Sequence, residues 1–248
     1  MGRERCLPET LTRYIFLLKK KRPRTLVGCG QLKMKTAKEA QWARSVQPRP
    51  PTRAVVFDAF GTLVAIRQRR WPFARLVRAT ADPRHALQVV MTRPLGLREA
   101  AQTLRCNEVP LSSLEADLAI ELDSITLFPE VSEALAAIRA LGLKIGIASN
   151  LAAPYAEPVA RQLPMVLDAY AWSFEIGFLK PDPMHYRWVC EELQVTPEET
   201  LMVGDTLLAD FHGARSYGLQ AVHLDRSGRA PKPDVPTIRT LVETLAWL

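Results

Sequence analysis

The stretch VVFDAFGTL, residues 55–63, decides how this chain folds and where its chemistry lies. A valine-rich apolar run leads directly into Asp58, and Gly61 and Thr62 follow in the same loop. Short apolar runs without polar alternation are typical of strands buried on both faces of a parallel sheet. The stretch therefore predicts a buried strand that delivers a carboxylate, with exposed backbone amides beside it, to one edge of a sheet.

Beyond this stretch, short apolar runs alternate with longer segments of helical periodicity, the pattern of a parallel α/β fold. We expect strands at 54–58, 143–149, 200–204 and 219–224, with a weaker one at either 166–168 or 171–174. The expected helices cover 129–141, 154–163, 184–193, 207–217 and 238–247. The sequence thus predicts an α/β fold with a Rossmann-like parallel sheet core flanked by helices.

Residues 66–127 interrupt this alternation with helical patterns alone, at 71–80, 84–91, 97–105 and 112–122. We therefore predict a small α-helical cap domain, residues 66–127, inserted into a core made of residues 54–65 and 128–248. Its first part is rich in arginine, including Arg67, Arg69, Arg75 and Arg78. Either one of these clamps a substrate anion, or they form a solvated helix face with Trp71 packed beneath it.

Composition excludes several classes of protein. Apolar residues make up 48% and charged residues 24%, values typical of a globular domain rather than a disordered chain. No apolar run approaches the roughly 18 residues of a membrane span, and no secretory core is present, so we expect no membrane partner. The four scattered cysteines, without a CxxC pair, fit neither a disulfide scaffold nor a zinc site and favour the cytoplasm.

The net charge of +7 is confined to the N-terminal arm. Residues 1–53 hold 14 Lys or Arg and 3 Glu, a balance of +11, whereas residues 54–248 hold 19 basic and 23 acidic residues, a balance of −4. We interpret residues 1–53 as a basic, poorly ordered extension that ends in a proline-rich linker. Non-specific contact with polyanions such as nucleic acid, a targeting presequence, or translation from Met34 are the alternatives; the acidic body argues against nucleic acid as the main partner.

Four polar features follow predicted strands, where open α/β sheets bind ligands. They are the Asp58 loop, Ser149-Asn150, the proline-restricted loop at Lys180, and the segment from Asp205 to Asp210. Asp58 and Asp205 form an oxygen-rich pair suited to Mg²⁺, and Lys180 offsets part of their charge. Together with hydroxyls and amides that can hold phosphoryl oxygens, this set suits attack of Asp58 on phosphorus to give an aspartyl-phosphate.

In this order the motifs resemble those of the haloacid dehalogenase superfamily of hydrolases, across residues 54 to about 228. The resemblance implies that Asp58 is the nucleophile and that Lys180 is the loop lysine. It implies phosphate contacts for Thr62 and Ser149, and a metal held by Asp58, Asp205 and the backbone carbonyl of Phe60, with Asp210 behind them. Family members with such caps usually act on small molecules, because the cap closes over the site and excludes water.

The first motif departs from the phosphatase pattern. Phe60 stands where phosphatases of this superfamily carry a second Asp that serves as general acid and base, a loss that typically costs about 10²–10⁴ in rate. The string around Phe60 resembles the dehalogenase branch instead, in which Asn150 would help to hold the halide. Metal-independent dehalogenases, however, lack the paired acids found here at Asp205 and Asp210.

We weigh the acidic pair more heavily, because a second carboxylate beside the nucleophile has the stronger electrostatic consequence. The sequence therefore predicts Mg²⁺-dependent hydrolysis of a small phosphorylated molecule, either an acyl phosphate with a good leaving group or an ester for which the cap supplies the missing acid. The alternatives are dehalogenase-like hydrolysis at carbon through an aspartyl ester, and a weakly active binding protein on the same fold.

Overall fold

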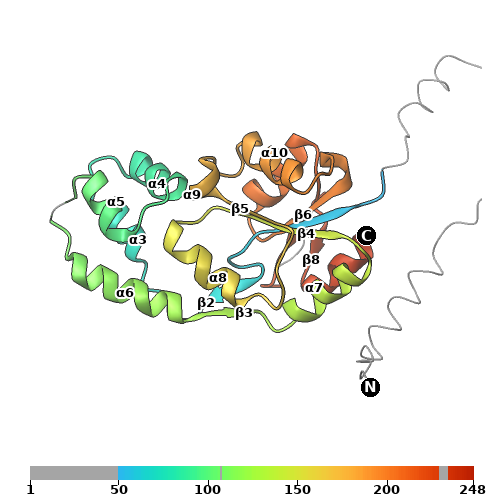
Figure 1. The fold of residues 1–248 in the computed structure, drawn as a ribbon, viewed down its shortest axis with the longest axis horizontal. Helices are drawn as coiled ribbons and strands as arrows, with labels where there is room; N and C mark the ends of the chain where they lie inside the picture. The colour runs from blue at the N-terminus through green and yellow to red at the C-terminus, as the bar shows by residue number, and fades with distance from the viewer. Residues whose placement is uncertain (1–49, 107, 229–233) are drawn as a thin grey trace, which may run out of the picture. The chain divides into compact units, whose positions relative to one another are not determined.

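Six parallel strands form one sheet in the order β5-β4-β1-β6-β7-β8 in the computed structural model, which describes residues 50–106, 108–228 and 234–248 (Figure 1). All but the last few residues of the predicted extension 1–53 lie outside the described residues. The strands are β1 (Ala54–Phe57), β4 (Lys144–Ser149), β5 (Ala169–Trp172), β6 (Thr200–Gly204), β7 (Gln220–Leu224) and β8 (Thr237–Ile238). The Rossmann-like α/β prediction is confirmed.

Strand β1 lies in the middle of this sheet, and all four of its residues are fully buried. The chain runs from β1 to β4 and β5 on one side, then crosses to β6 on the other side of β1. Such a reversal of strand order opens a crevice at the carboxyl ends of the strands, where ligands of open α/β sheets bind. The loops after β1 and β6 border this crevice.

Helices cover both faces of the sheet, with α10 on one side and α7 and α8 on the other (Figure 1). The helical segments of the core are α7 (Val131–Ala140), η1 (Ala153–Tyr155), α8 (Ala156–Gln162), α9 (Ser173–Ile176), α10 (Pro183–Glu192), η2 (Pro197–Glu199), the π-helical η3 (Leu207–Gly213), α11 (Ala214–Tyr217) and η4 (Leu241–Trp247). No helix in the described part of the chain is long and apolar enough to cross a membrane.

Two predicted elements differ from the structure. Strand β5 starts at Ala169, between the two expected positions, because the Asp168 carboxylate accepts a hydrogen bond from the Ile145 amide and takes the place of a ladder partner. The last helix starts at Leu241 rather than at residue 238, because Ile238 pairs with Leu224 in the sheet and Thr240 forms the capping box with Glu243.

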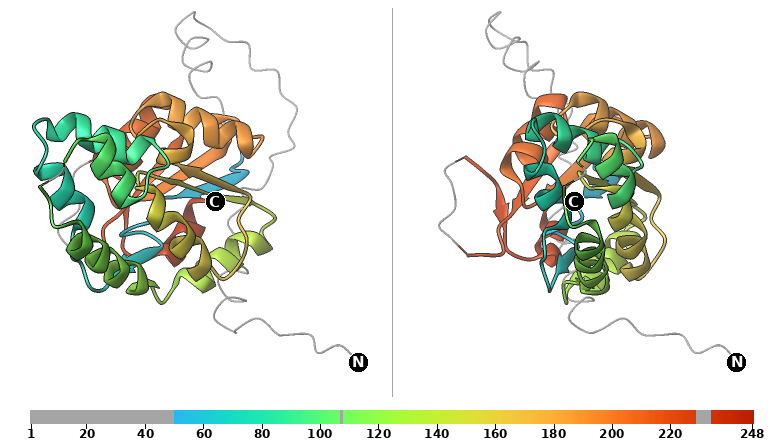
Figure 2. Two further views of the ribbon diagram at one scale, coloured as in Figure 1. Left: turned by 60° about the vertical axis from the view of Figure 1, so that its left-hand side comes forward. Right: turned by 90° about the vertical axis from the view of Figure 1, so that its left-hand side faces the viewer.

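A group of helices, which we call the insertion, separates two strands that follow the Asp58 loop. Strand β2 (Val64–Ile66) pairs antiparallel with β3 (Ile125–Leu127), and the chain leaves and re-enters the core through this short ribbon. This ribbon was not predicted, since three-residue strands leave no periodic pattern in the sequence. The helices between are α3 (Pro72–Arg78), α4 (Pro83–Thr92), α5 (Leu97–Thr103) and α6 (Leu111–Asp123), which gather beside the sheet in the left view of Figure 2.

Candidate active site

Three carboxylates converge at the crevice beside β1. Asp58 follows β1, Asp205 follows β6, and Asp210 lies on η3. One oxygen from each lies within 4.8 Å of the others, so that a single ion could contact all three. Asp58 and Asp210 are buried, whereas Asp205 is exposed to solvent. Residues separated by about 150 positions in the sequence therefore meet because their strands are neighbours in the sheet.

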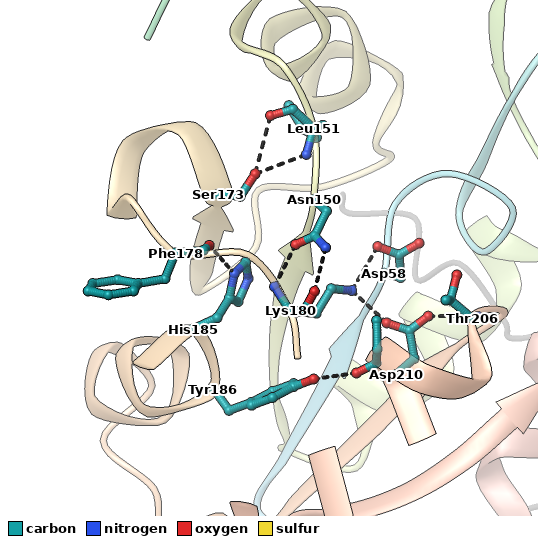
Figure 3. A network of polar contacts seen from close by, with 11 residues as sticks. Asp58, Asn150, Leu151, Ser173, Phe178, Lys180, His185, Tyr186, Thr206 and Asp210 are labelled. Atoms are coloured by element: carbon teal, nitrogen blue, oxygen red, sulfur yellow. Dashed lines mark hydrogen bonds and ion pairs between the residues drawn. The ribbon is translucent and has the colours of Figure 1, made fainter. Parts of the chain in front are cut away.

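Lys180 reaches into the same cluster from the loop between α9 and α10 (Figure 3). Its Nζ donates to Asp58 Oδ1 at 2.9 Å and to Asp210 Oδ1 at 2.6 Å. Burial by itself would lower the pKa of Lys180, but the charges of Asp210 and Asp58 outweigh it and raise the pKa above its ordinary value. The ammonium is therefore charged, and it links the nucleophile candidate to the acidic motif.

The cluster carries more negative than positive charge. Three ionised carboxylates and one ammonium have a formal charge of −2. Asp205 is exposed as a residue, but its carboxyl lies against the Asp58 loop, and this desolvation together with the charge of Asp58 raises the pKa of Asp205 to about 6. Burial likewise raises the pKa of Asp210 to about 6, in spite of the ion pair with Lys180. Like charges brought together out of water disfavour ionisation, and a cation bound among them would reverse this.

Glycine is required at position 61 of the Asp58 loop. Gly61 has a φ of 82°, a conformation that L side chains rarely adopt, and a Cβ at this position would collide with the Asp205 carboxylate. The backbone of the loop after β1 thus packs directly against the acidic residue after β6.

The remaining predicted site residues occupy distinct environments. Thr62 is fully buried and its hydroxyl has no hydrogen-bond partner among the residues that the structure describes, and Ser149 is buried at the end of β4. Contacts of these hydroxyls with a substrate stay predictions. The Asn150 side-chain amide holds the backbone of Lys180 through two hydrogen bonds. Its Nδ2 donates to the Lys180 carbonyl at 2.8 Å, and its Oδ1 accepts from the Lys180 amide at 2.7 Å (Figure 3).

Phe60, the residue that departs from the phosphatase pattern, is half-buried in the Asp58 loop. Its ring packs edge-on against Tyr155, with the ring centres 5.7 Å apart. An aromatic side chain offers no proton at this position. The contact with Tyr155 shows that it serves instead as a packing surface.

The lysine loop is held by residues that the sequence analysis did not assign. His185 is fully buried, and its Nδ1 hydrogen-bonds the Phe178 carbonyl at 2.8 Å. Burial and the charge of Lys180 lower the pKa of His185 to about 3, so the neutral imidazole donates this bond. The Tyr186 hydroxyl donates to the Ala209 carbonyl on η3. The Asp182 carboxylate caps α10, because its Oδ1 accepts from the Met184 amide at 2.9 Å.

The lysine loop follows its strand less directly than the other predicted site segments do, because the short helix α9 stands between β5 and the loop. The helix ends at Gly177, whose φ of 79° reverses the chain toward the crevice.

Arg226 supports the Asp58 loop from the far side. Its Nε donates to the Gly61 carbonyl at 3.1 Å and its Nη2 to the Thr62 carbonyl at 2.7 Å. The guanidinium also pairs with Glu130 and lies 3.7 Å from the centre of the Phe128 ring. Arg226 stands two residues beyond the end of β7. The principle that open α/β sheets bind ligands at the carboxyl ends of their strands could therefore have identified it.

The arginine-rich start of the insertion is only partly as expected. Arg67 and Arg75 bond Thr126 and Asp117, as solvated side chains do. Trp71 is not packed beneath them but is 52% exposed, with the Arg69 guanidinium 5.0 Å from its ring centre. The cause is local, since Trp71 adopts a left-handed backbone conformation ahead of Pro72 and turns outward.

Comparisons with known proteins agree with this geometry. The family model of haloacid dehalogenase-like hydrolases matches residues 52–218. (S)-2-haloacid dehalogenase 4A of Burkholderia cepacia is 26% identical over 215 residues, which span 79% of this chain and 93% of that protein. The phosphoserine phosphatase of Thermus thermophilus is 34% identical over 121 residues, 46% of this chain and 47% of that protein.

Solved structures show the same fold. A HAD phosphatase from Thermococcus onnurineus superposes with a TM-score of 0.58 at 22% identity, covering 79% of this chain and 97% of that one. The L-2-haloacid dehalogenase of Xanthobacter autotrophicus gives a TM-score of 0.56 at 23% identity, over 79% and 97% of the two chains. With its parallel sheet, its inserted helices and a family model that matches most of its length, this chain belongs to the haloacid dehalogenase-like hydrolases.

Proposed function

We propose that this hydrolase is a Mg²⁺-dependent phosphohydrolase that acts on a small phosphorylated molecule through an aspartyl-phosphate at Asp58. The observation that carries the proposal is the pair Asp205 and Asp210 beside Asp58, opposed by the single ammonium of Lys180. A site with a formal charge of −2 repels an anionic substrate unless a cation offsets it. A divalent cation would bring the cluster to neutrality.

The donor set fits Mg²⁺, which prefers oxygen ligands and usually takes only one or two carboxylates while keeping several waters. Asp58, Asp205 and the backbone carbonyl of Phe60 would hold it, and Asp210 would stand behind them because it already pairs with Lys180. When bound, Mg²⁺ supplies positive charge to the phosphoryl oxygens.

The chain's own residues account for the rest of the reaction. Lys180 binds Asp58 Oδ1, which fixes the carboxylate and leaves Oδ2 to attack phosphorus. The new bond joins Oδ2 to phosphorus as the bond from phosphorus to the leaving group breaks, and water then hydrolyses the aspartyl-phosphate. Ser149, Thr62 and the loop amides would hold the non-reacting oxygens. Because Phe60 cannot donate a proton, the leaving group must depart as a stable anion, as the carboxylate of an acyl phosphate does.

Dehalogenation is the second candidate, and a specific observation favours it. The haloacid dehalogenase of Burkholderia cepacia matches over 93% of its own length, whereas the match to the Thermus phosphatase covers 47% of that protein. The electrostatics oppose it, because the carboxylate of a haloacid would meet the excess negative charge of the cluster. A weakly active binding protein on this fold is the third candidate.

The three candidates separate in one set of assays on the full chain. We expect phosphate release from acetyl phosphate and aryl phosphates with Mg²⁺, and its loss when EDTA removes the metal. Asp58→Asn should lower turnover at least about a thousandfold, since it removes the nucleophile. Asp82→Asn, the same change at an exposed carboxylate that caps α4, should leave most activity.

Two outcomes would overturn the proposal. Metal-independent halide release from 2-haloacids, with no phosphate release, would identify a dehalogenase. Thermal stabilisation by Mg²⁺ without turnover on either panel would identify a binding protein.

The location of the enzyme is a further part of the proposal. Cys106 and Cys190, the cysteines within the described residues, are both free thiols. Free thiols persist in reducing compartments, which supports a cytoplasmic location.

A further inference from the structure

We propose that the leaving group of the substrate is an apolar body, an aryl or alkyl group, seated in a cavity between the insertion and the core. This inference rests on the proposed phosphohydrolase function and names the class of substrate. It starts from the cavity rather than from the acidic cluster.

The cavity measures about 250 Å³ and its walls are mostly apolar side chains. Phe73, Val77 and Val90 line it from the insertion, and Phe60, Leu151 and Tyr155 line it from the core. The Phe73 and Tyr155 rings lie 6.0 Å apart, so the two parts of the molecule meet here. Apolar walls of this extent favour an apolar ligand, because each methylene removed from water contributes about 0.8 kcal/mol.

The cavity adjoins the proposed catalytic site through two shared residues. Phe60 lies on the Asp58 loop, two positions after the nucleophile candidate, and forms part of the wall. Asn150 lines the cavity as well, and its amide braces the backbone of Lys180. A phosphoryl group at Asp58 therefore places the remainder of its substrate beside the cavity.

Two of the polar side chains that reach the cavity, Glu121 and Asn150, are bonded to protein atoms. Glu121 is buried, its Oε1 accepts from the backbone amides of Arg70 and Trp71, and its Oε2 accepts from the Tyr155 hydroxyl at 2.6 Å. Arg69, the third, is exposed at the rim, over the ring of Trp71. A hydroxyl or amino group buried against the apolar walls would lose water without gaining a partner, at a cost of about 1–3 kcal/mol.

The volume limits the size of the apolar body. An apolar cavity of about 150 Å³ takes up benzene. A cavity of about 250 Å³ therefore accommodates a substituted ring or a chain of about six carbons. Phosphoserine, the substrate that gives the Thermus relative its name, has a smaller and more polar body.

The test is the chain-length dependence of acyl phosphate hydrolysis. Acetyl, butanoyl and hexanoyl phosphate release carboxylates of nearly equal basicity, so their rates differ mainly through burial of the chain. We expect kcat/KM to rise about fourfold for each methylene, about 250-fold from acetyl to hexanoyl phosphate. A flat series, or one that falls with length, would overturn the inference.

Two variants on one helix locate the effect. Ala74 lines the cavity from α3, so Ala74→Trp should fill it and flatten the series. Ala79, at the C-terminal end of α3, is exposed and lies outside the wall, so Ala79→Trp should leave the series intact. Equal chain-length dependence in both variants would also overturn the inference.

A binding measurement separates this inference from the proposed function. Alkylphosphonates carry no ester bond to cleave, and calorimetry on the wild-type chain with Mg²⁺ should show affinity that rises from ethyl to hexylphosphonate. If affinity rises but no ester or anhydride is hydrolysed, the phosphohydrolase proposal fails and the cavity inference holds. If acetyl phosphate is hydrolysed while both series are flat, the cavity inference fails and the phosphohydrolase proposal holds.

Discussion

The acidic cluster and the apolar cavity share a border at Phe60, yet the sequence encodes them in different ways. The cluster is built at the carboxyl edge of the sheet, where Lys180 forms ion pairs with both Asp58 and Asp210. The cavity is built from helix faces of the insertion and from the core segments after β1 and β4, and its buried carboxylate, Glu121, is bonded to protein atoms. Reaction chemistry thus depends on topology, whereas substrate choice depends on helix packing.

Replacing Phe60, which lies between the acidic cluster and the cavity, by aspartate should have the largest effect on the rate of hydrolysis. Phe60→Asp restores a general acid beside Asp58, and we expect hydrolysis of hexyl phosphate, an ester with a poor leaving group, to rise by about 10²–10⁴. Acyl phosphates should gain little, because their leaving group needs no proton. Phe60→Asn, similar in size but unable to donate as an acid, is the control. A folded Phe60→Asp variant without gain on hexyl phosphate would refute our interpretation of Phe60.

Removing the Lys180 ammonium from the acidic cluster should lower both the free energy of unfolding and the turnover rate. Lys180→Met leaves Asp58 and Asp210 buried without their cation, and removal of one partner from a buried pair costs about 3–5 kcal/mol in the free energy of unfolding. Lys144, whose Nζ bonds only the Leu193 carbonyl among the contacts described, provides the matched control in Lys144→Met. Urea unfolding measures both. Equal small losses in the two variants would contradict the central role of Lys180.

A substitution in the wall of the cavity should leave the reaction at Asp58 intact. Tyr155→Phe removes the hydroxyl that donates a hydrogen bond to Glu121 Oε2. We expect a loss of about 1–3 kcal/mol in the free energy of unfolding, because that oxygen is left without its partner. The chain-length series should persist, because the ring remains. Tyr170→Phe, which removes a half-buried bond from the Leu167 amide, is the control. A collapse of the series in Tyr155→Phe would show that the hydroxyl contacts the substrate.

The acidic cluster should also make Mg²⁺ binding depend on pH, the smallest of these effects. The pKa values of Asp205 and Asp210 lie near 6 in the folded chain, above their ordinary value of 3.8. At pH values between these two, the folded state therefore binds more protons than the unfolded state. Stability without metal should therefore fall as pH rises from about 4 to about 7. Above about pH 7 both groups are ionised and can bind a cation.

Thermal unfolding with and without Mg²⁺ measures this dependence. We expect Mg²⁺ to raise Tm by a few degrees at pH 7.5 and by less at pH 5. Asp205→Asn should weaken the difference between the two pH values. The same Mg²⁺ effect at both pH values would contradict a site built from these carboxylates.

Much of the acidic cluster could be predicted from the sequence, because a buried apolar strand followed by Asp is a local pattern. β1 and β6 were placed within one residue, and their neighbourhood in the sheet brings Asp58 and Asp205 together. Arg226 was missed although it stands two residues after β7, because only carboxylates, hydroxyls, amides and Lys180 were considered at the strand ends. A cytoplasmic location and the roles of individual site residues stay predictions.

The apolar side could not be predicted, for a physical reason. Which faces of α3 and α4 meet Tyr155 depends on how the helices pack, and several arrangements satisfy the same periodicity. Glu121 illustrates this: within an amphipathic helix it reads as a surface residue, yet it is 2% exposed because its carboxylate holds the turn at Arg70 and Trp71.

The most direct measurement follows oxygen-18 from water during several turnovers of acyl phosphate with Mg²⁺, and of a 2-haloacid in parallel. If Asp58 attacks phosphorus and water then attacks the phosphoryl group, the label enters released phosphate and the peptide that contains Asp58 keeps its mass. Label in the Asp58 carboxylate together with halide release, and none in phosphate, would contradict phosphoryl transfer and show an aspartyl ester on carbon.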